Sequence, residues 1–222
     1  MIRKFDFLNF AIILLFSFSA NYYFGSIGVF PIDTFAFFDS AHFVNKGYLP
    51  IRDYWTSNGF LVDILQSLFF YFLGVNWNAY LFHSSLINSI FVIWTYKFLI
   101  DEGLNFKFSL FYSLSASLLL YPPVGVPFSD HHSIIFSLLS FYCIIAAYRK
   151  SSIKLLLLSI LFIFIAFLCK QIPAAFFMIF ISFYILFKAY VKKNYKWIFI
   201  SLIFSFSLLL LFGLILTLTK IE

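Results

Sequence analysis

The chain has 222 residues, of which 63% are hydrophobic and only 11% are charged, and its mean hydropathy is +0.99. A chain with so few polar residues cannot cover the surface of a soluble globule of this size. The composition therefore excludes a soluble protein and predicts an integral membrane protein. The net charge of +6 comes from basic residues scattered singly or in small groups between apolar runs. That pattern is typical of membrane topology signals, and we expect no nucleic-acid partner.

The first apolar run, residues 7–24, follows the basic pair Arg3 and Lys4. Phe18 stands where a signal-peptide cleavage site needs a small residue, so we expect an uncleaved first span with a cytoplasmic N-terminus. Further apolar segments follow, each close to the ~20 residues that a helix needs to cross the hydrocarbon core. They are residues 79–96, 108–121, 133–148, 155–169, 174–187 and 197–219.

The apolar segment 60–73 decides the topology of everything after it. If it crosses the membrane, eleven basic residues lie outside and four inside, which inverts the positive-inside rule. If it lies on the outer surface, the count reverses. Asp63 and Gln66, three residues apart, also give this short segment one polar edge, as in an interfacial helix. The eleven residues then inside are Arg3, Lys4, Lys97, Lys107, Arg149, Lys150, Lys154, Lys188, Lys192, Lys193 and Lys196.

The predicted fold is therefore all-α and polytopic, with seven transmembrane helices and additional interfacial helices in the first outer loop. Residues 1–222 form a single membrane domain. Its first outer loop, 28–78, holds a short helix and an amphipathic helix, and its second outer loop covers 122–132. The C-terminus is expected outside.

The first outer loop carries several acidic residues. Asp33 precedes a predicted short helix, 34–45, and is either the N-cap of that helix or a general base, two roles that are compatible. Asp39 and His42 lie on one helix face with Lys46, while the phenylalanines at 35, 38 and 43 can turn toward the membrane. A solvated interfacial edge is the simpler interpretation of that polar face.

Two basic residues are expected on the outer side near lipid phosphates. The guanidinium group of Arg52 could bind a lipid-linked phosphate through two hydrogen bonds, or form a local contact with Asp53, or anchor to headgroups. Lys170 ends a span on the side where basic residues are least expected. It either pairs with an anionic lipid phosphate or reaches to headgroups.

Asp130 opens the span after the second outer loop and is followed by His131 and His132. Consecutive helical residues point about 100° apart, so the two histidines do not form a metal-ligand pair. Asp130 is either a helix N-cap or, with one histidine and a carboxylate from the first loop, a ligand of a divalent cation. Whether a metal binds is left open. Within the spans, His83 and Asn88 are expected to form interhelical hydrogen bonds.

Together these features resemble the GT-C superfamily of membrane glycosyltransferases, in the bacterial branch of protein O-mannosyltransferases and lipid A aminoarabinose transferases. The resemblance covers the N-terminal seven-helix module. It rests on an early Asp in the first outer loop, the Gly-x-x-Pro-x-Arg-Asp-Tyr pattern at 47–54 and an amphipathic helix ending in Phe-Leu-Gly at 72–74. Asp130 looks like the acidic residue of that family's second loop, and 169–173 is similar to its Thr/Ser-Lys-x-x-Pro turn.

The resemblance implies transfer of a sugar from a polyprenyl-phosphate donor to an acceptor at the outer face of the bacterial inner membrane. By this resemblance Asp33 deprotonates the acceptor, Asp130 assists, and Arg52 and Lys170 face the donor phosphate. Candidate supporting residues are Asp39, Asp53 and His131. Membrane lipids, and a partner subunit that completes the enzyme, are the other expected partners.

Two alternatives remain open at this point. The chain could be a non-catalytic membrane subunit or lipid-binding scaffold of an envelope glycan pathway, or a truncated and inactive relative. A transporter is disfavoured, because no charged relay runs through the spans and no paired broken helices are visible.

Overall fold

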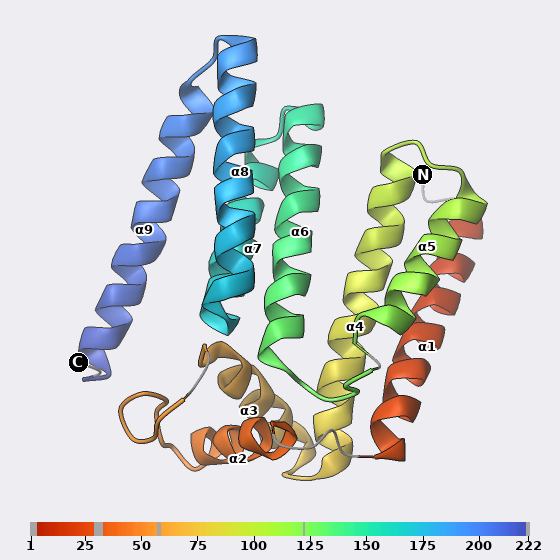
Figure 1. Ribbon diagram of the computed structural model, residues 1–222, viewed down its shortest axis with the longest axis vertical. Coiled ribbons are helices and arrows are strands. Elements are labelled where there is room, and N and C mark those ends of the chain that lie inside the picture. The colour runs from red at the N-terminus through yellow and green to blue at the C-terminus, as the bar shows by residue number, and fades with distance from the viewer. Residues whose placement is uncertain (1–3, 29–32, 57–58, 122, 221–222) are drawn as a thin grey trace. The chain divides into compact units, whose positions relative to one another are not determined.

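The computed structural model describes residues 4–28, 33–56, 59–121 and 123–220. Within these ranges the regular secondary structure is α-helical, apart from an isolated bridge at Pro50 and Tyr54, which confirms the all-α prediction (Figure 1). The helices are α1 (Lys4–Ile27), α2 (Thr34–Asn45), α3 (Leu61–Leu73), α4 (Trp77–Asp101), α5 (Phe106–Leu119), α6 (Ser129–Lys150), α7 (Ile153–Cys169), α8 (Gln171–Lys192) and α9 (Lys196–Leu218).

Four helices in the described ranges are long and apolar enough to cross a membrane: α6, α8, α9 and the Phe7–Ile27 part of α1. The structure therefore has the character of an integral membrane protein. The other three predicted spans do not meet the same measure. Helices α5 and α7 have only 14 and 17 residues, and α4, although 25 residues long, buries polar side chains such as His83 and Asn88.

The helix boundaries lie within about five residues of the predicted segments, and the turn expected at 170–173 is shorter than predicted. The expected turn is reduced to Lys170, whose extended backbone (φ −162°, ψ 132°) ends α7 and begins α8. Pro173 then lies inside the first turn of α8, where a missing N–H breaks no helical hydrogen bond.

The described chain forms two compact units, each treated by itself below. Unit 1 comprises residues 1–47 and 62–131, and unit 2 comprises residues 48–61 and 132–222.

In unit 1, helices α1 and α4 run antiparallel. Phe10 packs edge-on against Tyr96 near one end of the pair, with ring centroids 5.8 Å apart. Near the other end, the hydroxyl of Tyr22 donates to Oδ1 of Asn78 at 3.0 Å. The C-terminal end of α1 and the N-terminal end of α4 therefore lie side by side, so the chain between them leaves and returns at the same end of the unit.

Polar side chains hold the helices of unit 1 together. The amide of Asn88 donates to the Ser17 carbonyl of α1 at 3.3 Å and to the Ser117 carbonyl of α5 at 3.0 Å. Nδ1 of His83 lies 2.8 Å from Oε1 of Gln66. Both residues thus form the interhelical hydrogen bonds expected of them. Small and amide side chains at helix interfaces allow close backbone approach and satisfy polar groups away from water.

Helices α2 and α3 lie across the N-terminal end of α4 (Figure 1). The ring of Phe38 in α2 packs on Phe70 of α3 and on Tyr80 of α4, with centroids 4.9 and 5.3 Å apart. Phe38 therefore faces the protein interior and not the membrane, contrary to the prediction, whereas Phe35 and Phe43 are exposed. An aromatic ring shared by three helices fixes this short helix pair on the end of α4.

In unit 2, helices α6 to α9 pack around an aliphatic core that includes Ile144, Leu156, Ile163 and Ile181. Helices α6 and α7 approach closely at two serines, which exchange hydrogen bonds. The Ser140 hydroxyl donates to the Ser159 carbonyl at 2.7 Å, and the Ser159 hydroxyl donates to the Ser140 carbonyl at 2.9 Å. No residue of α9 is buried, as expected for a helix whose apolar side chains face lipid.

Candidate functional site

Asp33 stands immediately before α2, at the predicted N-cap position, but it does not cap the helix. Its backbone is in the αR region (φ −97°, ψ −16°), and its side chain accepts no hydrogen bond from the first turn of α2, all of whose residues are described. The side chain is exposed. The simplest structural role predicted for this carboxylate is therefore not the one observed.

Asp130 is the second residue of α6, and Ser129 is the first. An acidic group in the first turn of a helix is stabilised by the unpaired N–H groups there, so the carboxylate has a structural reason for its position. His131 lies beside the rings of Tyr121 and Phe128, with centroids 5.1 and 5.7 Å away. His132 is fully buried and its ring faces Phe136. The two histidines thus have different neighbours, as their helical positions imply.

One tyrosine joins the segments that carry Asp33 and Asp130. The buried hydroxyl of Tyr80 lies 2.9 Å from the Thr34 carbonyl, next to Asp33, and 3.3 Å from the Pro127 carbonyl in the connection between α5 and α6. The rings of Phe37 and Phe128 make a second contact between the same segments, at 5.4 Å. Asp33 and Asp130 therefore belong to segments that pack together at one end of unit 1.

A pair of glycines lets the second loop approach α1. A Cβ atom on Gly125 would lie 2.4 Å from the Cα atom of Gly25, and Gly125 has φ +73°. The carbonyl of Gly125 accepts hydrogen bonds from Ser84 at 2.8 Å and from the Asn21 amide at 3.3 Å. These contacts fix the backbone of the loop that leads to Asp130.

In unit 2, the guanidinium group of Arg52 is engaged by its neighbour. Nε and Nη2 donate to the two carboxylate oxygens of Asp53 at 2.9 and 2.7 Å, and Nη1 donates to the Thr219 carbonyl at 3.2 Å. Oδ2 of Asp53 also accepts from the Leu49 backbone N–H at 2.7 Å. Of the roles considered for Arg52, the local contact with Asp53 is the one seen. These bonds use three of the five guanidinium N–H donors, so a phosphate bound at the Nε and Nη2 edge would have to displace this carboxylate.

This exposed ion pair shifts the ionisation of both groups. The hydrogen bond with Asp53 raises the pKa of Arg52, and the hydrogen bonds from Arg52 and the Leu49 N–H lower the pKa of Asp53 below its ordinary 3.8. Since the carboxylate is favoured in the folded state, the contribution of the pair is present above the ordinary pKa of Asp53. It is lost as the pH falls through the lowered value.

Lys170 is half-buried at the junction of α7 and α8, and its carbonyl accepts a 2.9 Å hydrogen bond from Ser133 of α6. Residues 59 and 60, which precede α3, reach the same end of unit 2. A Cβ atom on Gly59 would lie 2.0 Å from the Leu168 carbonyl oxygen, and the Phe60 ring stacks on Phe212 of α9. Lys170 and Arg52 thus belong to one end of unit 2, where α7 ends, α8 begins and α9 ends.

The predicted site residues fall into two groups by unit. Asp33, Asp39, Asp130 and His131 belong to unit 1, and Arg52, Asp53 and Lys170 belong to unit 2. Asp39 is exposed on α2. Nowhere in the described ranges do three or more His, Cys, Asp or Glu side chains gather as metal ligands would.

Sequence reasoning missed several residues that build this end of unit 1. Tyr80 has no motif around it, and its place at the start of an apolar segment gives no sign of its hydrogen-bond partners. Gln66 and His83 were each noticed, but their pairing across 17 residues of chain was not. Gly25 and Gly125 form a close contact 100 residues apart that neither local sequence indicates.

Comparisons of the chain with models of protein families, with curated proteins and with solved structures found no match.

Proposed function

We propose that the chain is a GT-C type glycosyltransferase, or the catalytic module of one, that transfers a sugar from a polyprenyl-phosphate donor at the outer face of a bacterial inner membrane. The proposal starts from the sequence resemblance. The structural observation that supports it best is the junction at Tyr80, where the segments holding Asp33 and Asp130 pack together. An Asp33 side chain that makes no cap hydrogen bond is also in accord with a role toward a ligand.

The proposed reaction assigns each residue one step. The Asp33 carboxylate accepts the proton of an acceptor hydroxyl, whose oxygen then attacks the anomeric carbon of the donor sugar. The bond between that carbon and the phosphate oxygen breaks, and its electron pair leaves with the polyprenyl phosphate. Attack opposite the leaving group inverts the anomeric carbon. Lys170, and Arg52 once released from Asp53, stabilise the negative charge on the departing phosphate.

The proposal includes seven membrane crossings, with α2 and α3 on the outer surface. The return of the chain to one end of unit 1 between α1 and α4 is in accord with an α3 that does not cross. The short α5 and α7 and the more polar α4 then cross inside their units, where polar side chains are paired with neighbouring helices. In this topology Asp33, Arg52, Asp130 and Lys170 all face outward.

A second candidate is a non-catalytic subunit or scaffold that binds lipid-linked glycans. The observation in its favour is that Nε, Nη1 and Nη2 of Arg52 are all engaged by Asp53 and Thr219. Such a residue positions the loop without contacting a substrate phosphate.

The two candidates are separated by a donor-turnover assay. The purified chain is reconstituted in vesicles with a radiolabelled mannosyl polyprenyl phosphate and an envelope extract as acceptor, and both transferred label and released polyprenyl phosphate are measured. We expect Asp33→Asn to reduce turnover at least about 100-fold, the usual contribution of a general base. Glu102→Gln, which removes a carboxylate from the other end of α4, should leave turnover unchanged.

Undiminished transfer by the Asp33→Asn protein would show that Asp33 is not the base. No turnover of mannosyl, glucosyl or aminoarabinosyl donors by the folded wild-type chain would overturn the glycosyltransferase proposal and favour the scaffold.

A further inference from the structure

Unit 2 contains a run of basic residues with few acidic residues in the same part of the sequence. Between His131 and Ile221 the sequence has nine Lys or Arg residues and no Asp or Glu. Seven of them gather at the connections α6–α7 and α8–α9: Arg149, Lys150, Lys154, Lys188, Lys192, Lys193 and Lys196. The acidic residue described in unit 2, Asp53, is bound to Arg52 beside Thr219, at the opposite end of α9. At 1.5 Å per residue, the length of α9 separates Asp53 from the α8–α9 connection by roughly 30 Å. This end of unit 2 therefore carries a concentration of positive charge.

Three of these seven residues, Lys188, Lys192 and Lys196, line a cavity of about 260 Å³. It is lined by Tyr148, Ser151, Ile153, Lys188, Lys192, Asn194, Lys196 and Trp197, which belong to all four helices of the unit or to their connections. The ammonium groups of the three lysines, the hydroxyl of Ser151 and the side-chain amide of Asn194 can all donate hydrogen bonds to a phosphate. The cavity is smaller than a site for a drug-sized molecule, which needs ~300–1,000 Å³.

Aromatic rings hold two of these lysines at the cavity. Nζ of Lys192 lies 5.8 Å from the centroid of the Tyr148 ring, and Nζ of Lys188 lies 5.3 Å from that of Tyr184. The Tyr148 ring in turn packs on Trp197 with centroids 4.5 Å apart. Cation–π contacts limit the positions available to the long side chains, so a bound anion meets ammonium groups that are already partly ordered.

We propose that this cavity binds the headgroup phosphate of an anionic phospholipid. Tyrosine and tryptophan rings are enriched at headgroup depth, and basic pockets between membrane helices bind anionic headgroups. The neighbouring surfaces of α8 and α9, including Phe187, Val191 and Phe199, are apolar and exposed, so acyl chains can extend along them. A phospholipid can contact these apolar surfaces through its acyl chains, and a free phosphate cannot. This difference favours a lipid as the ligand.

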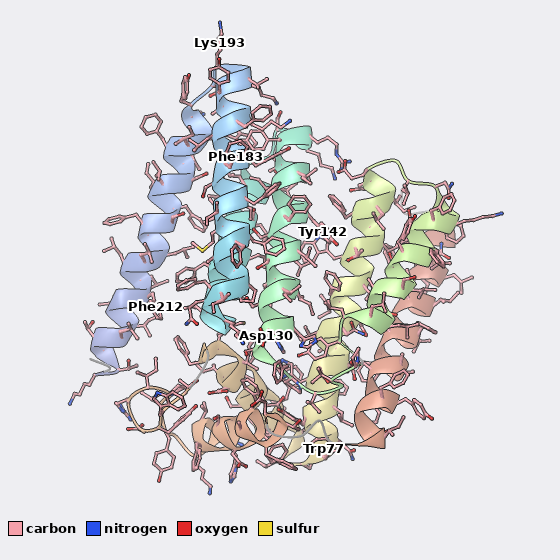
Figure 2. The ribbon with its side chains drawn as sticks, viewed as in Figure 1. Trp77, Asp130, Tyr142, Phe183, Lys193 and Phe212 are labelled. Carbon is pink, nitrogen blue, oxygen red and sulfur yellow. The ribbon has the colours of Figure 1, made fainter. Side chains whose placement is uncertain are left out.

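The test compares two variants that lose equal charge from the same end of unit 2. Lys188→Gln/Lys192→Gln removes two lysines that line the cavity. Lys154→Gln/Lys193→Gln removes two exposed lysines outside the lining, and the side chain of Lys193 projects away from α8 (Figure 2). Phosphatidylglycerol, phosphatidylcholine and inorganic phosphate are titrated against the full chain in neutral detergent, and bound lipid is counted by native mass spectrometry. Circular dichroism and gel filtration confirm that each variant is folded.

We expect phosphatidylglycerol to bind the wild type in preference to phosphatidylcholine and to resist displacement by inorganic phosphate. The cavity variant should weaken this binding roughly 30-fold, at about 1 kcal/mol for each lysine, and the control variant by less than about threefold. A Lys188→Arg/Lys192→Arg protein, which keeps both charges, should retain the preference.

Three results would overturn the proposal. Equal weakening by both charge-removing variants would mean that a diffuse surface field attracts the lipid, and not this cavity. Equal affinity for phosphatidylcholine would show that the headgroup charge is not recognised. Displacement by millimolar inorganic phosphate would identify a site for a free anion.

Discussion

At the residue scale, Tyr80 does the most to organise the candidate site. It is fully buried, and its hydroxyl lies within hydrogen-bond reach of the Thr34 carbonyl in α2 and of the Pro127 carbonyl before α6. One O–H group donates one proton, so the 2.9 Å contact to Thr34 is the stronger bond and the 3.3 Å contact to Pro127 is secondary. Because both segments lead directly to predicted acidic residues, the hydroxyl couples the position of Asp33 to that of Asp130.

Removing this hydroxyl should destabilise unit 1 measurably. We expect Tyr80→Phe to lower the free energy of unfolding by about 1 kcal/mol, because a buried carbonyl loses its donor while the ring remains. The matched control is Tyr22→Phe, which removes an exposed hydroxyl bonded to Asn78 and should cost less than about 0.5 kcal/mol. Unfolding in mixed micelles followed by circular dichroism measures both. Equal costs would mean that the Tyr80 bonds hold no more stability than a surface contact.

At the scale of the elements, the sequence predicted the helices better than their partners. All of the predicted segments became helices, and α2 has the predicted bounds, because hydrophobic runs and their polar interruptions are local signals. The inward turn of Phe38 and the pairing of Gln66 with His83 depend on contacts between helices far apart in the chain. The hydrophobic periodicity of one helix does not indicate which other helix will pack on each of its faces.

The contact between α1 and the connection from α5 to α6 gives a prediction at this scale. Gly125→Ala places a Cβ atom 2.4 Å from the Gly25 Cα atom on a backbone with φ +73°, so both a clash and backbone strain result. Gly103→Ala is the matched control, since Gly103 has φ +90° but nothing within 4 Å of the added atom. We expect the Gly125 variant to be destabilised by about 2 kcal/mol more than the Gly103 variant. Because both glycines have a positive φ, this difference is the cost of overpacking alone. Thermal unfolding in detergent would reveal the difference, and similar stabilities would contradict the close helix-to-loop contact.

At the scale of the whole molecule, composition and charge predicted a helical membrane protein, and the helices agree. The candidate site was predicted less fully. The roles of Asp33, Asp130, Arg52 and Lys170 came from the resemblance, and the pairing of Arg52 with Asp53 was one of several alternatives. An ion pair and a phosphate contact use the same donors on a guanidinium group, so the sequence does not decide between them.

The topology depends on α3 and can be tested with three single cysteines in a chain whose Cys143 and Cys169 are replaced by alanine. Both native thiols are buried. Tyr48→Cys precedes α3, Asn76→Cys follows it, and Ser151→Cys lies in the connection between α6 and α7. We expect a membrane-impermeant thiol reagent to label residues 48 and 76 from the outer side of intact cells, and residue 151 after permeabilisation only.

This pattern follows from the charge distribution, which puts the connections that hold Arg149, Lys150 and Lys154 in the cytoplasm, and from the side-by-side ends of α1 and α4. If α3 crosses the membrane instead, every later connection changes sides. Residues 48 and 151 would then label together from outside and residue 76 would not. That result would place Arg52 opposite Lys170 across the bilayer, so it would also overturn a shared donor-phosphate site.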